Sequence, residues 1–283
     1  MSTGISTTAA ETAHLPADGR SALASFPRLM ASEWTKLRSV RSTFWSFGIM
    51  IVLVLGFTAL IVALNVANWD KSDASQQAAI RLDPAGDILG SGFFLGQLAV
   101  CVLGVMVVTS EYSTGMIRAS LLAVPKRVPM LAAKAVVFSA TVFVVGEVLS
   151  FGSFFIGAPI LRKKVPVALG DPGVLRAVIG GGLYLTLLGL FAMSIGAVVR
   201  HTAGGITGVI AFVQVLAPLA GLLPGSVGKH IHAYLPTEAG HLIAQSHQGT
   251  KDLLTPVQGF GVFCVWTAVA LLLAGYLLKR RDA

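Results

Sequence analysis

One ionisable side chain lies inside a long apolar run of this sequence, and it is the first candidate for chemistry. Glu147 falls near the middle of the run 135–157. A carboxylate at that depth in a bilayer costs roughly 2.5–3.5 kcal/mol, so we expect it to face other helices in its protonated form. Gln97 and Gln214 lie in two other apolar runs and are candidates to share a polar cavity with it. Two interpretations stay open: a substrate or proton site, and a protonated acid hydrogen-bonded to a neighbouring helix.

The motifs that usually carry catalysis are missing from the sequence. It contains no GxxxxGK[ST] phosphate loop and no GxGxxG dinucleotide fingerprint. It also lacks HExxH, GxSxG and CxxC, which serve zinc, hydrolase and redox chemistry. We therefore predict that the chain is not an enzyme and needs no cofactor of its own.

Histidines gather in one polar segment near the C-terminal end. Four of the six lie there: His230, His232, His241 and His247. No carboxylate or cysteine stands at ligand spacing, so we predict a solvated loop and no metal site. The two cysteines fall inside apolar runs, which indicates buried small side chains and no disulfide framework.

Six apolar runs must position these residues, and together they predict an all-α membrane protein. Charged residues make up 12% of the 283-residue chain, about half the share of a soluble domain, and the mean hydropathy is +0.78. Each run holds 21 to 23 residues, enough for a helix to cross a hydrocarbon core of about 30 Å. The predicted spans are 44–64, 88–109, 135–157, 177–199, 203–223 and 257–278.

The distribution of lysine and arginine predicts which side of the membrane holds the termini. Six spans place both termini on one side. Thirteen of the 21 lysine and arginine residues then fall on that side, so we expect it to be cytoplasmic. The cluster Arg162-Lys163-Lys164 falls on the other side and opposes this assignment.

The residues before the first span divide into a tail and an amphipathic helix. Residues 1–25 are rich in Ser, Thr and Ala and have no apolar core, so we expect a disordered tail and no ordinary cleaved signal peptide. Residues 26–43 place apolar side chains on one helical stripe, with Trp34 at headgroup depth. The opposite face is charged and is expected to meet solvent and anionic lipid; it holds Arg28, Glu33, Lys36, Arg38 and Arg41. Residues 279–283 form a second short tail.

The connections predict three further features. Arg200-His201-Thr202 is the only link between the fourth and fifth spans, so those spans form a tight hairpin whose many glycines allow close packing. Pro218 is expected to kink the fifth span. The segment 224–256 is expected to hold one or two short re-entrant-like helices, one of them capped by Thr237.

The polar stretch from Ser110 to Lys134 lies between the second and third spans, on the predicted cytoplasmic side. It carries four cations and can serve as a surface on which a partner docks. The order Glu111-Tyr112-Ser113-Thr114-Gly115-Met116-Ile117-Arg118, followed by Leu121-Leu122-Ala123-Val124-Pro125-Lys126-Arg127 and Lys134, resembles the first cytoplasmic loop of ABC-2 type ABC transporter permeases. The segment Ser32-Glu33-Trp34-Thr35-Lys36-Leu37-Arg38-Ser39 resembles their elbow helix, particularly in actinomycete members.

The resemblance covers about residues 26–281 and implies a role as well as a fold. It implies a permease subunit in a bacterial plasma membrane that pairs with a second permease, either a copy of itself or a related chain. Separate P-loop ATPase subunits would bind ATP and magnesium, and residues 111–118 would couple to them. Glu111, expected near the start of a loop helix, would suit the positive end of its dipole. The implied activity is export of a hydrophobic or amphipathic compound, such as a drug, an antibiotic or a lipid-like molecule.

Two other functions stay open from the sequence. Glu147 suits a proton- or ion-coupled secondary carrier, although such carriers usually show internal repeats, which we do not find in the sequence. The loop also suits a membrane anchor or regulator that recruits a partner and moves no substrate.

Overall fold

The computed structural model describes residues 26–39, 41–116, 127–249 and 252–280, and it is helical. Those residues contain no β-strand, which confirms the predicted all-α class. The helices are α1 (Phe26–Ser39), α2 (Arg41–Ala67), α3 (Ala74–Leu82), α4 (Pro84–Ser113), α6 (Arg127–Leu161), α7 (Val174–Val199), α8 (Thr202–Ala211), α9 (Ala217–Ala220), α10 (Gly225–Ala233), α11 (Pro236–His241) and α12 (Pro256–Arg280). Short 3-10 turns cover Trp69–Lys71 and Leu242–Ala244.

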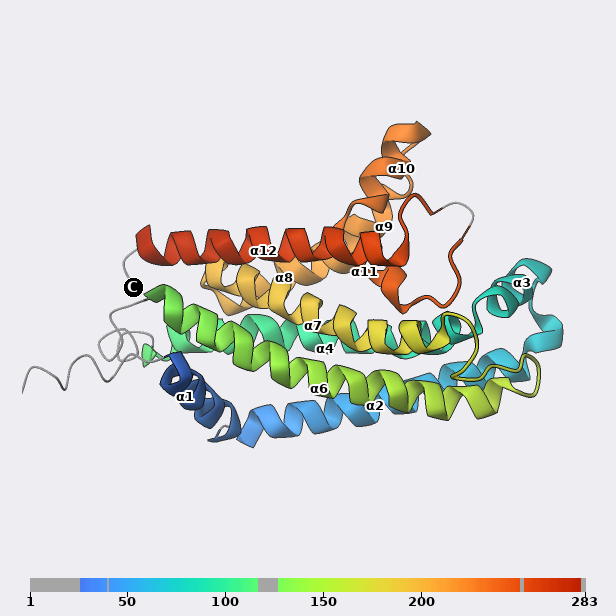
Figure 1. Ribbon diagram of the computed structural model, residues 1–283, viewed down its shortest axis with the longest axis horizontal. Helices are drawn as coiled ribbons and strands as arrows, with labels where there is room; N and C mark the ends of the chain where they lie inside the picture. The colour runs from blue at the N-terminus through green and yellow to red at the C-terminus, as the bar shows by residue number, and fades with distance from the viewer. Residues whose placement is uncertain (1–25, 40, 117–126, 250–251, 281–283) are drawn as a thin grey trace, which may run out of the picture.

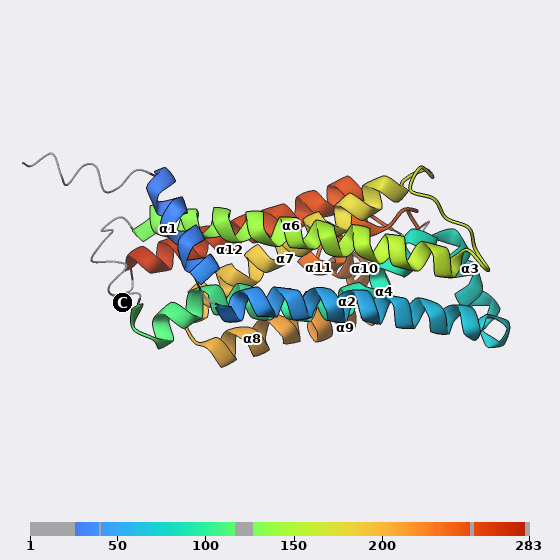
Figure 2. The same cartoon turned by 90° about the horizontal axis from the view of Figure 1, so that it is seen from below.

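Six helical segments are long and apolar enough to cross a membrane, so the chain is a multi-pass membrane protein. They are Trp45–Ala67, Pro84–Ser113, Arg127–Leu161, Val174–Val199, Thr202–Ala220 and Pro256–Arg280. Figures 1 and 2 show them running side by side along the long axis. Their outward faces are apolar, with Val52, Val144 and Leu272 more than 60% exposed, as expected where lipid is the solvent.

Several helices continue well beyond the apolar runs of the sequence. α6 has 35 residues, which is about 52 Å of helix against a core of about 30 Å. α4 starts before its apolar run because Asp83 caps it: the Asp83 carboxylate accepts a hydrogen bond from Gly86 N at 2.9 Å, with Pro84 in the first turn. The same carboxylate accepts hydrogen bonds from Ser246, which ties the start of α4 to the segment before α12.

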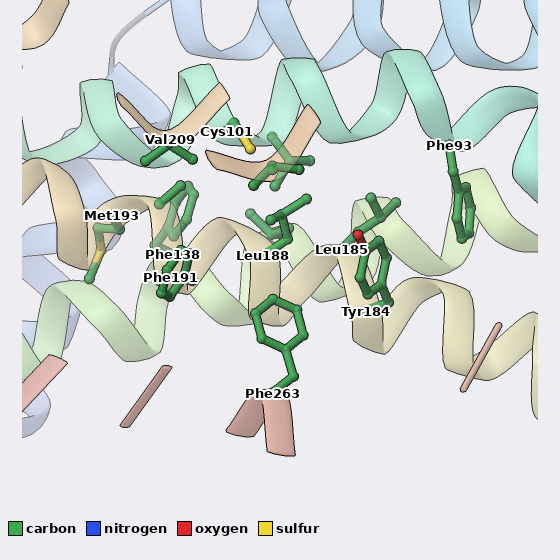
Figure 3. Packing of buried hydrophobic residues seen from close by; sticks show 14 of the residues in the cluster. Phe93, Cys101, Phe138, Tyr184, Leu185, Leu188, Phe191, Met193, Val209 and Phe263 are labelled. Carbon is green, nitrogen blue, oxygen red and sulfur yellow. The ribbon is translucent and has the colours of Figure 1, made fainter. Parts of the chain in front are cut away.

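Helix α7 is the centre of the bundle. In its most apolar stretch 61% of the residues are buried inside the protein. In the corresponding stretch of Thr202–Ala220 the share is 22%. It packs against α4, α6 and α12, and Figure 3 shows its Tyr184, Leu188 and Phe191 meeting Phe138 and Phe263 from two of these neighbours. Tyr184 and Phe263 lie with ring centroids 5.8 Å apart.

Glycines set how closely the central helices approach. A Cβ atom on Gly104 of α4 would lie 2.5 Å from the carbonyl oxygen of Gly189 in α7. Gly92 and Gly96 of α4 form a GxxxG pair that faces Val54 of α2, so this pair packs two helices of the same chain. The second GxxxG pair, Gly204 and Gly208, behaves differently: a Cβ on Gly208 would meet no atom within 4 Å.

The predicted hairpin between the fourth and fifth spans is confirmed. α7 ends at Val199, and Arg200 takes a left-handed conformation with φ 57° that reverses the chain. His201 then caps α8 by accepting a hydrogen bond from Gly204 N at 3.1 Å. The reversal therefore needs only two residues between the helices.

The fifth span contains an irregular turn at the place where proline interrupts it. Phe212–Leu216 forms a π-helical turn that includes Gln214, and Pro218 lies in the first turn of α9. Since proline has no N–H to donate to the carbonyl four residues earlier, the regular α-helical pattern breaks there. The predicted interruption at Pro218 thus takes the form of a π-bulge.

Short helices occupy the segment before α12, as predicted, but Thr237 does not cap one. Leu235 holds the N-cap position of α11, and Pro236 starts the helix. The Thr237 side chain is buried and its Oγ1 has no hydrogen-bond partner. Proline is favoured at the first helical position because its missing N–H would be unpaired there anyway, which moves the start of the helix two residues earlier.

The two ends of the described chain lie at the same end of the bundle. Figure 1 shows α1, the end of α4, the start of α6 and the C-terminal end of α12 at one end of the bundle. Helix α3 and the end of α6 lie at the opposite end. The described residues therefore begin, at Phe26, and end, at Arg280, at the same end of the bundle.

Candidate functional site

Four charged side chains meet where α1, α4 and α6 come together. Lys134 Nζ donates to Glu33 Oε2 at 2.5 Å and to Glu111 Oε1 at 2.8 Å. Lys36 Nζ lies 2.7 Å from Glu33 Oε1 and 3.3 Å from Glu111 Oε1. This four-charge cluster joins the first helix to both ends of the segment that links the second and third spans.

The four-charge cluster is buried and electrically balanced. Glu33 and Glu111 are each 4% exposed and Lys134 is 6% exposed, whereas 37% of the Lys36 side chain is exposed. Two carboxylates and two ammonium groups cancel, which is what makes burial of the charges tolerable. Removing one partner from such a cluster leaves an uncompensated charge, a far larger penalty than losing a surface pair.

The neighbours of Glu33 and Lys36 shift the pKa of each group toward its charged form. Burial acts to raise the pKa of Glu33, but the charge and hydrogen bond of Lys134, with help from Lys36, outweigh burial and leave the pKa below its ordinary 4.5. Burial acts to lower the pKa of Lys36, but hydrogen bonds and attraction to Glu33 and Glu111 leave it above its ordinary 10.5. Both groups therefore stay charged at neutral pH.

The charged face of the first helix is not arranged as predicted. Glu33, expected on the solvent-facing side, points inward to Lys134. Arg38 is exposed, and Trp34 is 52% exposed while it lines an apolar groove of about 580 Å³ between α1 and α6. The positions of the apolar residues alone predict that Glu33 faces solvent. In the structure its ion pair with Lys134 outweighs the preference of the carboxylate for water.

The predicted coupling residues begin inside α4, and their side chains play different parts. Tyr112 stacks under the Arg200 guanidinium at 5.1 Å. The hydroxyls of Ser113 and Thr114 both donate to the Ser110 carbonyl, at 3.1 and 2.7 Å. Gly115 ends the helix with φ 71°, a conformation that glycine adopts without strain.

The rest of the predicted coupling segment is only partly described. Met116 is exposed, while Ile117 and Arg118 lie outside the described residues. Glu111 lies in the last turn of α4, so the expected favourable position at the start of a helix is wrong. At a C-terminal end the helix dipole disfavours an anion, and Lys134 and Lys36 supply the compensation.

The three candidate cavity residues do not form one polar patch. Glu147 lies against Gly182 of α7, but neither of its carboxyl oxygens has a hydrogen-bond partner. The Nε2 atom of Gln214 is also buried and unpartnered. Gln97 is half-buried on α4, and within the described parts of the chain no hydrogen bond joins any two of the three.

The four C-terminal histidines are dispersed as well. His232 lies 3.4 Å from Glu238, and burial raises the pKa of Glu238, an effect that His232 partly offsets. His241 packs edge-on against Tyr184, and burial lowers its pKa. Over the ranges that the structure describes, no three His, Cys, Asp or Glu side chains are placed to hold a metal ion.

Contacts of two arginines were not anticipated from the sequence. Arg127, at the start of α6, donates to the Leu278 carbonyl at 3.1 Å, and Arg200 reaches the Leu277 carbonyl at 3.5 Å. Both carbonyls lie in the last turn of α12, where cations suit the helix dipole. The sequence did contain a signal for these contacts, because each arginine lies at a helix boundary.

The chain matches no protein-family model, and no curated protein matches it.

Proposed function

We propose that the chain is the membrane-spanning subunit of an ATP-binding cassette exporter. The observation that carries this proposal is the four-charge cluster, which links α1 to both helices that flank the polar stretch after Met116. A force applied at that stretch would reach the second and third spans and the first helix together. Such a link is what a permease needs when its motor is a separate protein.

The motor in this proposal is a P-loop ATPase subunit that docks on the segment between α4 and α6. Gly115 and Met116 leave the bundle at that point, and the exposed Met116 offers an apolar contact. The sequence has no phosphate-binding loop of its own, and the loop motif resembles that of ABC-2 permeases. In this arrangement α1 is the interfacial elbow helix, both termini are cytoplasmic in the bacterial plasma membrane, and a second permease completes the complex.

The cargo in this proposal is a hydrophobic or amphipathic compound. The spans carry few polar side chains, and the described grooves between helices are mostly apolar. A cargo of that kind is carried by shape and apolar contact, so it leaves no short motif in the sequence.

The docking proposal can be tested with matched variants. The chain would be co-expressed with the P-loop ATPase encoded beside its gene, and complex formation and ATP hydrolysis would be measured in detergent. Met116→Asp should abolish co-purification of the ATPase, because it places a charge in the apolar contact. Leu82→Asp, at a 56% exposed position at the opposite end of the bundle, should leave the complex intact.

Two results would refute the docking proposal. One is undiminished co-purification of the ATPase with the Met116→Asp variant, provided that the variant elutes as a folded protein. The other is the absence of a P-loop ATPase gene from the neighbourhood.

One observation favours a second candidate, a proton-coupled carrier. Both carboxyl oxygens of Glu147 are buried without a partner, so a proton is the simplest group to satisfy one of them. For this carrier, transport would persist after ATP depletion, stop when the proton gradient is dissipated, and be lost in Glu147→Gln. For the exporter, ATP depletion would stop transport and the gradient would not matter.

A further inference from the structure

A cleft opens beside the four-charge cluster, on the side of α1 that faces α2 and α4. Its volume is about 230 Å³, and it is lined at its polar end by Lys36 and Glu111. Leu103 and Met106 of α4 line its apolar end. One small cavity therefore offers both charge and an apolar wall.

The cleft continues into a groove between α2 and α4. That groove has a volume of about 420 Å³ and is lined by apolar side chains such as Leu53 and Leu95. The two cavities share Ser46, Leu103 and Met106, so they form one path. From Glu111 to Leu95 the path follows α4 for about 24 Å at 1.5 Å of rise per residue. This shape suits a molecule with a polar head and a long apolar tail.

One hydrogen-bond acceptor at the polar end of the cleft is unpaired. Glu111 Oε1 accepts from both lysines, while Glu111 Oε2 is buried and has no partner. A buried carboxylate oxygen left unpaired is costly, so the site favours a ligand that brings an N–H or O–H donor. Lys36, whose side chain is 37% exposed, offers a cation to an anionic group of the same ligand.

We propose that this cleft binds a membrane phospholipid with a phosphoethanolamine headgroup. Its ammonium group would donate to Glu111 Oε2, and its phosphate would lie by Lys36. One acyl chain would occupy the groove between α2 and α4. The proposal does not depend on whether the chain transports anything.

The headgroup chemistry separates this lipid from the other common ones. A choline headgroup carries the same charges but no N–H, so it leaves Glu111 Oε2 unpaired. A headgroup with a net negative charge would add an uncompensated charge near Glu33 and Glu111, because the lysines already balance the charges of these two carboxylates. The ethanolamine headgroup is zwitterionic and supplies the missing donor.

The experiment uses the full-length protein in detergent micelles with equal amounts of ethanolamine and choline lipids of identical acyl chains. Bound lipids would be counted by native mass spectrometry. We expect about a tenfold preference for ethanolamine over choline lipid, the scale of a hydrogen bond to a charged group. Singly and doubly methylated ethanolamine lipids, which keep an N–H, should bind nearly as well as the unmethylated lipid.

A pair of variants tests the position of the tail. Met106→Trp should fill the junction of the two cavities and displace the bound ethanolamine lipid. This variant leaves the four charged residues unchanged. Val136→Trp, at a site of similar exposure (45% against 44%) in the groove between α1 and α6, should keep the lipid and its preference. Equal retention of ethanolamine and choline lipid by the wild type, or an unchanged ethanolamine preference in folded Met106→Trp, would overturn the proposal.

Discussion

At the scale of single residues, Lys134 decides how three parts of the chain meet. It bonds Glu33, which is 101 residues earlier, and Glu111, which is 23 residues earlier. Burying either carboxylate without a partner would cost free energy. The position of α1 and that of the end of α4 therefore both depend on this lysine. A single ammonium group therefore links the first helix to the second and third spans.

The first prediction concerns loss of that link. Lys134→Met should lower the free energy of unfolding by about 3–5 kcal/mol, because it leaves two buried carboxylates to share the partly exposed Lys36. Lys164→Met, which breaks the 3.1 Å surface pair with Asp70, should cost at most about 1 kcal/mol. Denaturant titration in mixed micelles measures both values. Equal effects of the two variants would show that the four-charge cluster does not stabilise the fold.

The second prediction concerns pH. The pKa of Glu33 is depressed in the folded protein, so the stability that this carboxylate contributes is complete above pH 4.5 and is lost as pH falls through its lower folded pKa. The gap in unfolding temperature between wild type and Glu33→Gln should therefore be constant from pH 7 to pH 5 and shrink below pH 4.5. A gap that widens on acidification would mean that Glu33 is not held as an anion.

At the scale of elements, close contact between α4 and α7 depends on glycine, and so does the central position of α7. Gly104 and Gly189 bring the two backbones together, while Gly181 leaves room for Phe93 and for Ser150. In lipid there is little hydrophobic gain from helix association, so close packing of small residues supplies much of the attraction. The fifth span is the least buried of the six, although Gly205 also brings α8 close to Val105 of α4.

The third prediction compares two glycines in those elements. Gly104→Ala should destabilise the protein by about 1–3 kcal/mol, because its methyl group meets the Gly189 carbonyl and the Ala192 side chain. Gly208→Ala meets no atom within 4 Å and should be neutral or stabilising, since alanine favours helix. Thermal unfolding of the two variants in one detergent gives the comparison. Equal loss of stability in both would refute the assigned contact.

At the scale of the whole molecule, the bundle has two distinct ends. One end holds α1, the four-charge cluster and the last turn of α12, with cations bonded to its carbonyls. The other end holds α3 and the exposed pair of Lys164 with Asp70. The proposed function requires that the first of these ends face the cytoplasm.

The fourth prediction tests that orientation in intact cells. Ser113 and Ser75 are both exposed serines, one at each end of the bundle. With Cys101 and Cys264 replaced by alanine, Ser75→Cys should react with a membrane-impermeant maleimide from outside. Ser113→Cys should react only after the cells are permeabilised. The reverse pattern would place the predicted coupling segment outside the cell and exclude an intracellular ATPase as its partner.

The sequence alone determined the number of spans, their approximate limits and the tight hairpin at Arg200. These features depend on local hydropathy and on short connections, so neighbouring residues suffice to predict them. The sequence also pointed to Glu33, Glu111 and Lys134 as notable residues, but it gave Glu33 a solvent-facing position and Glu111 the wrong end of a helix.

Tertiary structure decided which of these residues meet. Whether a carboxylate turns toward water or toward a lysine 101 residues away depends on how the helices pack, and helical periodicity does not contain that information. The same holds for Gln97, Glu147 and Gln214, which have similar polarity and depth but no hydrogen bonds with one another. Hydropathy specifies that a helix lies in the membrane, and only packing specifies which of its faces meets another helix.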